Sequence, residues 1–72
     1  MAEIKLGKYR HFRGGEYEVL GVAKDSDTLK EFVVYKALYG EGQIWIRGIE
    51  NFLEMVERDG KRFARFEYLG HK

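Results

Sequence analysis

The sequence predicts an all-β fold, either a small, strongly bent antiparallel sheet or an SH3-like barrel, with about five to six strands and at most one short helical turn. β-branched and aromatic residues dominate the segments between glycine-containing turns, which is typical of pleated strands. The chain contains no proline, and an Asp59-Gly60 dipeptide separates two alternating runs, as in a two-residue hairpin. An open sheet with one short helix is the alternative architecture.

The chain length of 72 residues predicts a single domain over residues 1–72, with residues 1–7 as a loose lead-in. A domain of this size buries only about 60% of the surface that its unfolded chain exposes, so we expect modest stability. The sequence has no cysteine, which excludes disulfides and thiolate metal sites. Five Phe, five Tyr and one Trp compensate in part, and they predict an aromatic-rich core that leaves little room for a deep pocket.

The first third of the chain predicts a short basic segment, a tight turn and a strand. Residues 8–13 (KYRHFR) interleave basic and aromatic side chains. Residues 13–16 (RGGE) form a turn because glycine tolerates positive φ. Residues 17–24 (YEVLGVAK) predict a strand, and Gly21 in its middle predicts a β-bulge or a sharp bend.

Two connections are candidates for the short helical turn. Residues 25–28 (DSDT) have the composition of a turn, and one helical turn over residues 28–31 is expected there with Asp27 as its cap. A 3₁₀ turn over residues 48–51 is the other candidate.

The densest apolar run covers residues 32–47 and is interrupted only at residues 40–42 (GEG), so it predicts two adjacent strands. Alternation places one set of side chains on the core face of the first strand, namely Val33, Tyr35, Ala37 and Tyr39. In the second strand, Ile44 and Ile46 point to one side and Trp45 and Arg47 to the other. If the isoleucines face the core, the Trp–Arg pair faces outward.

The Asp59-Gly60 turn fixes a register for the last unit of the chain, residues 52–69. Pairing about this turn produces two opposite-charge pairs and three apolar pairs, each contributing about 0.2–1 kcal/mol. The expected pairs are Glu57 with Arg62, Val56 with Phe63, Met55 with Ala64, Glu54 with Arg65, and Leu53 with Phe66.

Charge and hydropathy narrow the classes of partner. The net charge of +1 argues against a generic polyanion binder, but residues 1–24 carry +2, residues 25–57 carry −4 and residues 58–72 carry +3. If the two ends meet in space, they form one basic face. No segment has the ~18 consecutive apolar residues of a membrane span, and no signal-peptide pattern opens the chain. We therefore expect a cytoplasmic protein with no membrane partner.

The sequence lacks a catalytic constellation. It has no Cys, and its one Ser and one Thr both lie in the turn at residues 25–28. The two histidines are far apart and lack metal-ligand spacing, so we expect no metal and no cofactor. Neither glycine-rich turn opens a helix after a strand, as phosphate loops do. An enzyme or ligand-binding accessory that uses His11 with Glu16 or Glu18 is kept as the alternative function.

Basic residues interleaved with aromatic residues indicate a binding module. Single-stranded nucleic acid is held by bases that stack on aromatic rings while arginines contact phosphates, and the same ingredients suit a peptide groove or an aromatic cage. Two alternatives stay open: Tyr9 and Phe12 belong to the core, or Trp45 is its central plug. We expect a monomer, with weak self-association through a strand edge at residues 8–12 as a further alternative. The predicted binding residues are Tyr9, Arg10, His11, Arg13, Trp45 and Arg47.

The whole chain resembles a bacterial family known as domain of unknown function number 1653. The resemblance rests on GKYRHFRGGEYEVLGVA at residues 7–23, VVYKALYGEG at residues 33–42, WIR at residues 45–47, and DGKRFARFEYL at residues 59–69. It implies a compact, stand-alone β domain and no assigned reaction, so no catalytic residue follows from it. Gly48 and Ala64 stand where that family's pattern implies proline, which makes both positions less rigid here.

Overall fold

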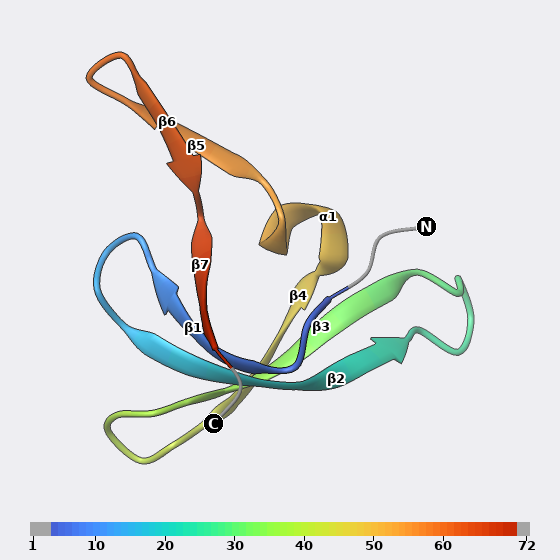
Figure 1. Cartoon of the computed structure of the whole chain (residues 1–72). Coiled ribbons are helices and arrows are strands. Elements are labelled where there is room, and N and C mark those ends of the chain that lie inside the picture. The colour runs from blue at the N-terminus through green and yellow to red at the C-terminus, as the bar shows by residue number, and fades with distance from the viewer. Residues whose placement is uncertain (1–3, 71–72) are drawn as a thin grey trace.

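The computed structural model describes residues 4–70 as seven strands and one helical turn (Figure 1). Five strands form an antiparallel sheet in the spatial order β4-β3-β2-β1-β7. The remaining two form a separate hairpin, β5–β6, which extends away from the sheet (Figure 1). The elements are β1 (Gly7–His11), β2 (Glu16–Lys24), β3 (Glu31–Ala37), β4 (Ile44–Gly48), α1 (Ile49–Phe52), β5 (Met55–Arg58), β6 (Lys61–Ala64) and β7 (Phe66–Gly70).

A β-bulge bends β2 at its centre. Val19 pairs with Tyr35, but the next pair joins Gly21 to Val34, so Leu20 is an extra residue on the β2 side. An unpaired residue of this kind bends its strand and increases the local twist. The bulge that the sequence predicted at Gly21 is confirmed, and it gives the five-stranded sheet a concave face.

Aromatic rings fill this concave face. The rings of Phe52 from α1 and Phe66 from β7 stack in parallel, with centroids 4.1 Å apart and planes inclined by 6°. Tyr35 meets both rings edge-to-face, and such offset or T-shaped pairs are the preferred aromatic geometries. The helical turn is short, but it seats two buried side chains on the sheet. The core cluster is Tyr9, Val19, Val33, Tyr35, Ile49, Phe52 and Phe66.

The strongly bent antiparallel sheet is confirmed, whereas the SH3-like barrel is not formed. Closure would require β4 and β7 to pair, but they lie at opposite edges of the five-stranded sheet. The bent sheet has five strands, as predicted, and the separate β5–β6 hairpin brings the described residues to seven strands in all. The β5–β6 hairpin leaves the sheet instead of closing it (Figure 1).

The core face of β3 follows the prediction for three of its four residues. Val33, Tyr35 and Ala37 are buried, as alternation along the strand predicted. Tyr39 lies beyond the end of β3 and is 54% exposed, so its assignment to the core was wrong. Strand alternation does not extend past the last paired residue.

β4 presents the opposite faces to those expected. The ladder pairs Trp45 with the buried Tyr35, and directly paired residues lie on the same face of a sheet. Trp45 and Arg47 therefore lie on the concave side, and Ile44 and Ile46 lie on the convex side, where they are 60% and 63% exposed. The alternative in which the isoleucines face the core is therefore not realised, because the covered face of this edge strand is the concave one and nothing in the described residues covers its convex face.

The hairpin register is confirmed over its central pairs. Asp59 and Gly60 both have positive φ, as the favoured two-residue hairpin turn requires. Beyond the ladder, an Arg65 Nη2 atom lies 3.0 Å from Glu54 Oε1, which also brings the fourth expected pair together. The ladder pairs Glu57 with Arg62, Val56 with Phe63, and Met55 with Ala64.

The fifth expected pair, Leu53 with Phe66, was wrong. Phe66 begins β7 and pairs with His11 of β1, while Leu53 is exposed after α1. The Phe66 side chain removes more apolar area from water when it packs against the aromatic core than it would in a surface hairpin, and this burial favours its place in β7.

The helical turn forms at the second of the two candidate connections. α1 begins directly after β4, whereas the first candidate, residues 28–31, is not helical. Leu29 there has a φ of 64°, in the left-handed region, and the Asp25 carboxylate accepts two backbone N–H groups at 2.8 and 3.1 Å. The aspartate thus stabilises a turn that competes with a helix.

β1 is an interior strand. It pairs with β2 on one side and with β7 on the other, so the segment over residues 8–12 is not a sheet edge. The expectation of self-association through that edge was therefore wrong.

Candidate functional site

A hollow of about 670 Å³ opens beside the aromatic core, at the end of the sheet where the β1–β2 and β3–β4 turns meet. It is lined by residues from three parts of the chain, namely His11, Arg13, Gly14, Gly15, Glu16, Tyr17, Leu38, Tyr39 and Arg47. Three of these carry basic side chains and two carry phenol rings. We call this hollow the basic pocket.

The β1–β2 turn forms one wall of the basic pocket. The His11 N–H donates to the Gly15 carbonyl, and the Gly14 N–H donates to the His11 carbonyl, both at 2.7 Å. Gly14 has a φ of 112°, which side chains rarely adopt. A Cβ on Gly15 would lie 3.2 Å from both phenol groups of the pocket, so glycine leaves these rings room.

His11 lies at the base of this wall as a neutral donor. Its Nδ1 accepts the backbone N–H of Arg13 at 3.1 Å, so the neutral ring carries its proton on Nε2. Its ring contacts Phe12 and Phe66, with centroids 4.6 and 4.8 Å away. Burial lowers the pKa of His11, and the positive charges of Arg47, Arg65 and Arg13 lower it further.

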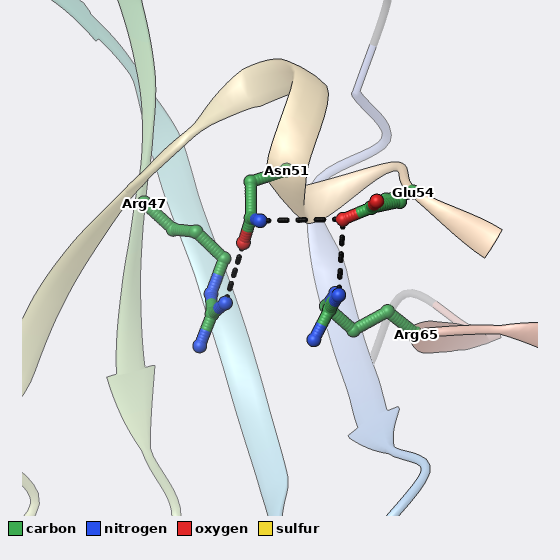
Figure 2. Close-up of polar contacts among 4 residues, drawn as sticks. All are labelled: Arg47, Asn51, Glu54 and Arg65. Atoms are coloured by element: carbon green, nitrogen blue, oxygen red, sulfur yellow. Dashed lines mark hydrogen bonds and ion pairs between the residues drawn. The ribbon is translucent and has the colours of Figure 1, made fainter. Parts of the chain in front are cut away.

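Arg47 projects from β4 into the same pocket and is held in place by three contacts. Its Nε donates to the Tyr35 hydroxyl at 3.2 Å, and its Nη1 donates to the Asn51 side-chain oxygen (Figure 2). Its guanidinium also lies over the Phe66 ring, 5.3 Å from the centroid. Two of the five guanidinium N–H groups are used in these bonds, and within residues 4–70 the other three remain for a ligand.

The tether of Arg47 continues into a second arginine. Figure 2 shows Arg47, Asn51, Glu54 and Arg65 joined in one chain of contacts that runs past α1. The Asn51 amide donates to Glu54 Oε1 at 3.3 Å, and Arg65 donates to the same oxygen at 3.0 Å. The Nε atom of Arg65 is buried and finds no acceptor among the described residues. Glu54 thus contacts Arg65 directly and is linked to Arg47 only through Asn51, so a single carboxylate accompanies two arginines in this chain of contacts.

Tyr17 and Tyr39 form the opposite wall. Their hydroxyl oxygens lie 2.6 Å apart, and their rings meet edge-to-face with centroids 5.5 Å apart. Burial raises the pKa of Tyr17 to about 12, and the hydrogen bond with Tyr39 acts in the same direction. The Tyr17 phenol is therefore neutral at physiological pH, and the two residues offer ring faces and hydroxyl groups to a ligand.

Trp45 lies in a second, smaller hollow of about 290 Å³ on the other side of Tyr39. The indole is 48% exposed, so it does not plug the core. Tyr39 lines both hollows, which places an exposed indole, an exposed phenol and the basic pocket in succession on the concave side.

Comparison with known proteins identifies the family. The sequence profile of the family described as "Protein of unknown function (DUF1653)" matches residues 7–68. The chain belongs to the DUF1653 family. A solved structure of a DUF1653 protein from Bordetella bronchiseptica is 32% identical and superposes with a TM-score of 0.87, covering 97% of this chain and 92% of that chain. No curated protein shows significant similarity to the chain.

Two features are absent from residues 4–70 of this DUF1653 chain. Residues 4–70 contain no group of three or more His, Cys, Asp or Glu side chains placed to hold a metal ion. Over the same residues, no helix has the length and apolar character needed to cross a membrane.

The DUF1653 fold brings together three of the six predicted binding residues and places a fourth beside them. His11, Arg13 and Arg47 line the basic pocket, and Trp45 lies in the adjoining hollow. Sequence reasoning had named these residues from aromatic and basic neighbours in two separate stretches. The pairing of β4 with β3 explains why the second stretch reaches the first.

The other two predicted residues lie elsewhere in the DUF1653 fold. Tyr9 is only 6% exposed, and its hydroxyl donates to the Lys5 carbonyl, so it belongs to the core. Arg10 is exposed, but its ladder partner is Glu16 and it alternates with the buried Tyr9, which places its side chain on the convex face. Neither residue lines the basic pocket.

Sequence reasoning missed the two tyrosines of the DUF1653 pocket. Tyr39 was assigned to the core, and Tyr17 was considered only as a strand residue. The sole sequence signal for them is their position next to the glycine turns, because turns at one end of a sheet place their flanking residues together.

Proposed function

We propose that this chain is an interaction module that binds single-stranded nucleic acid along its concave side. One observation carries the proposal: His11, Arg13 and Arg47 line a single pocket that adjoins two exposed aromatic side chains, Tyr39 and Trp45. Basic groups flanked by stacking surfaces are the combination that holds unpaired bases and their phosphates.

Each component has a defined part in this binding. A phosphate accepts hydrogen bonds from the free N–H groups of Arg47 and from the Nε2–H of His11, while Arg13 adds charge at the rim. Bases stack on Tyr39 and Trp45, at about 1–3 kcal/mol per base. The tethered guanidinium needs little reorganisation, so less entropy is lost when it binds.

The acid–base alternative has less support from the geometry. A His–carboxylate dyad requires a carboxylate against the imidazole, but the His11 imidazole accepts its hydrogen bond from the backbone N–H of Arg13. Glu16 lines the same pocket, yet it forms an ion pair with Lys8 at 3.8 Å. Binding is therefore the function we propose, and the cysteine-free sequence suits a module of the bacterial cytosol.

The test uses the indole itself. Trp45 is the sole tryptophan, so its fluorescence reports directly on this surface. Titration with a short oligothymidine should quench the emission, and the affinity should fall as salt rises, with a slope near −0.7 per phosphate neutralised. An affinity for oligothymidine that ignores salt, or no quenching at low salt, contradicts the proposal. Binding of an extended peptide in its place would identify the other class of partner.

A further inference from the structure

The edge strand β4 is built to accept another strand. It pairs with β3 on one side only, and its other side meets no strand of the described residues. The main-chain groups on that side are a template for pairing. Proteins protect such edges with charged side chains, proline or bulges. β4 contains no lysine, proline or bulge, and its one charged side chain, Arg47, is held against Tyr35 and Phe66 on the concave face.

The side chains of β4 are also unusually apolar for a free edge. Ile44, Trp45 and Ile46 are consecutive and all about half exposed or more. Ile44 and Ile46 lie on the convex face, while Trp45 and Arg47 lie on the concave face. The opposite edge strand, β7, differs because its pairing with β1 contains a register shift. β4 is thus the one flat edge of the five-stranded sheet.

We propose that β4 pairs with β4 of a second copy of this chain, antiparallel and about a two-fold axis that passes between the two Trp45 residues. A two-fold axis normal to the sheet keeps convex faces on one side, so residues must pair with residues of the same face. A centre on any of the five residues of β4, Ile44 to Gly48, satisfies this condition.

Only the centre at Trp45 gives each isoleucine an isoleucine partner. Ile44 then lies opposite Ile46 of the second copy, and Ile46 lies opposite Ile44 of the second copy. Centring on Ile46 sets Ile44 against Gly48, and centring on Ile44 sets Ile46 against Gly42, a turn residue with a φ of 68°. Apolar cross-strand pairs stabilise a ladder, whereas glycine offers no side chain to pack.

The same register is electrostatically compatible. It sets Arg47 opposite Gln43 of the second copy, so like charges do not meet. Gln43 already continues the β3–β4 ladder, because its carbonyl accepts the Ala37 N–H at 2.9 Å. In an isologous contact every residue pair occurs twice, so the contact surface must be complementary to itself.

The assembly is a ten-stranded sheet that carries both basic pockets on one side, with the two indoles between them. This inference is independent of the proposed function, because the pairing requires only the edge and its side chains. If both hold, the dimer doubles the length of the concave surface.

Sedimentation equilibrium of the full chain from micromolar to millimolar concentration tests the pairing. We expect a reversible monomer–dimer equilibrium, and Ile46→Lys should shift it to monomer by at least tenfold in Kd, since an edge lysine opposes strand pairing. Leu29→Lys is the matched control, at a 67% exposed position in the β2–β3 turn. A wild-type monomer at millimolar concentration overturns the proposal.

Cysteine cross-linking tests the register, because the native chain has no thiol. Trp45→Cys should oxidise to a disulfide dimer, whereas Ile44→Cys and Ile46→Cys should cross-link when mixed but not alone. Leu29→Cys should remain a monomer. Dimers that form equally well with Leu29→Cys, or with Ile44→Cys alone, contradict the proposed two-fold centre.

Discussion

Replacing Arg47 by glutamine should remove one phosphate contact from the basic pocket and leave the fold in place. With Arg13 and Arg47 both neutralising phosphates and His11 neutral, the salt slope of oligothymidine binding is about −1.4, or about a sevenfold loss of affinity between about 50 and 200 mM salt. In Arg47→Gln the slope falls to about −0.7, and the same change in salt weakens binding only about 2.6-fold.

The measurement is the quenching of Trp45 fluorescence at four or more salt concentrations, with Arg10→Gln as the matched control. Arg10 carries the same charge on the convex face, away from the basic pocket, so its loss should leave the slope unchanged. Equal slopes for wild type and Arg47→Gln would refute the assignment of Arg47 to a phosphate. Arg47 also bonds Tyr35 and covers Phe66, so we expect about 1–3 kcal/mol of lost stability, to be measured first in urea.

Asn51→Ala tests the positioning of the Arg47 guanidinium separately from its charge. The variant keeps the guanidinium but removes the acceptor that holds its Nη1. Affinity should fall because the freed side chain loses rotamer entropy on binding, whereas the salt slope should stay at the wild-type value. A slope that falls together with the affinity would show that Asn51 does more than orient Arg47.

Three further predictions concern stability and pH. Leu29→Asn should raise the free energy of unfolding in urea by about 1 kcal/mol, because Leu29 has a φ of 64° and asparagine tolerates the left-handed region better; an unchanged midpoint contradicts this strain. The lowered pKa of His11 means that the unfolded chain binds more protons, so stability should decline as pH falls below about 6.5 and His11→Gln should flatten that decline in thermal melts. The raised pKa of Tyr17, about 12, means that the folded chain holds its phenol proton longer, so stability should fall as pH rises from about 10 to 12, and Tyr17→Phe should lessen this fall.

Features of the chain that depend on neighbouring residues could be predicted from the sequence. The hairpin about Asp59-Gly60 is an example, because positive φ at the turn and matched cross-strand pairs select one register locally. The bulge at Gly21 is another, since a glycine inside an apolar strand marks a bend.

Features that depend on distant pairing could not. The alternation of Ile44 to Arg47 is the same whether the isoleucines or the Trp–Arg pair face the core. The contacts of β4 with α1 and the aromatic core decide which of these two faces is covered. The assignment of Tyr9 to the site failed for the same reason: Tyr9 lies on the concave face, where the aromatic core covers it, and local composition does not reveal which face is covered. His11, Arg13 and Arg47 were named from the sequence because basic and aromatic residues lie side by side in both stretches, and the fold brings these three to one pocket.

The basic pocket packs directly against the aromatic core, and this contact decides which substitutions report on binding. Arg47 lies over Phe66, and Phe66 stacks on Phe52, which is 1% exposed. At about 0.05–0.15 kcal/mol per residue, a chain of this length has about 4–11 kcal/mol of stability, and Phe52→Ala alone costs about 3–5 kcal/mol. Loss of binding in such a variant therefore reports unfolding. Substitutions at the rim, at Arg13 and Tyr39, change the surface offered to a ligand and leave the stack intact, so binding lost there reports recognition.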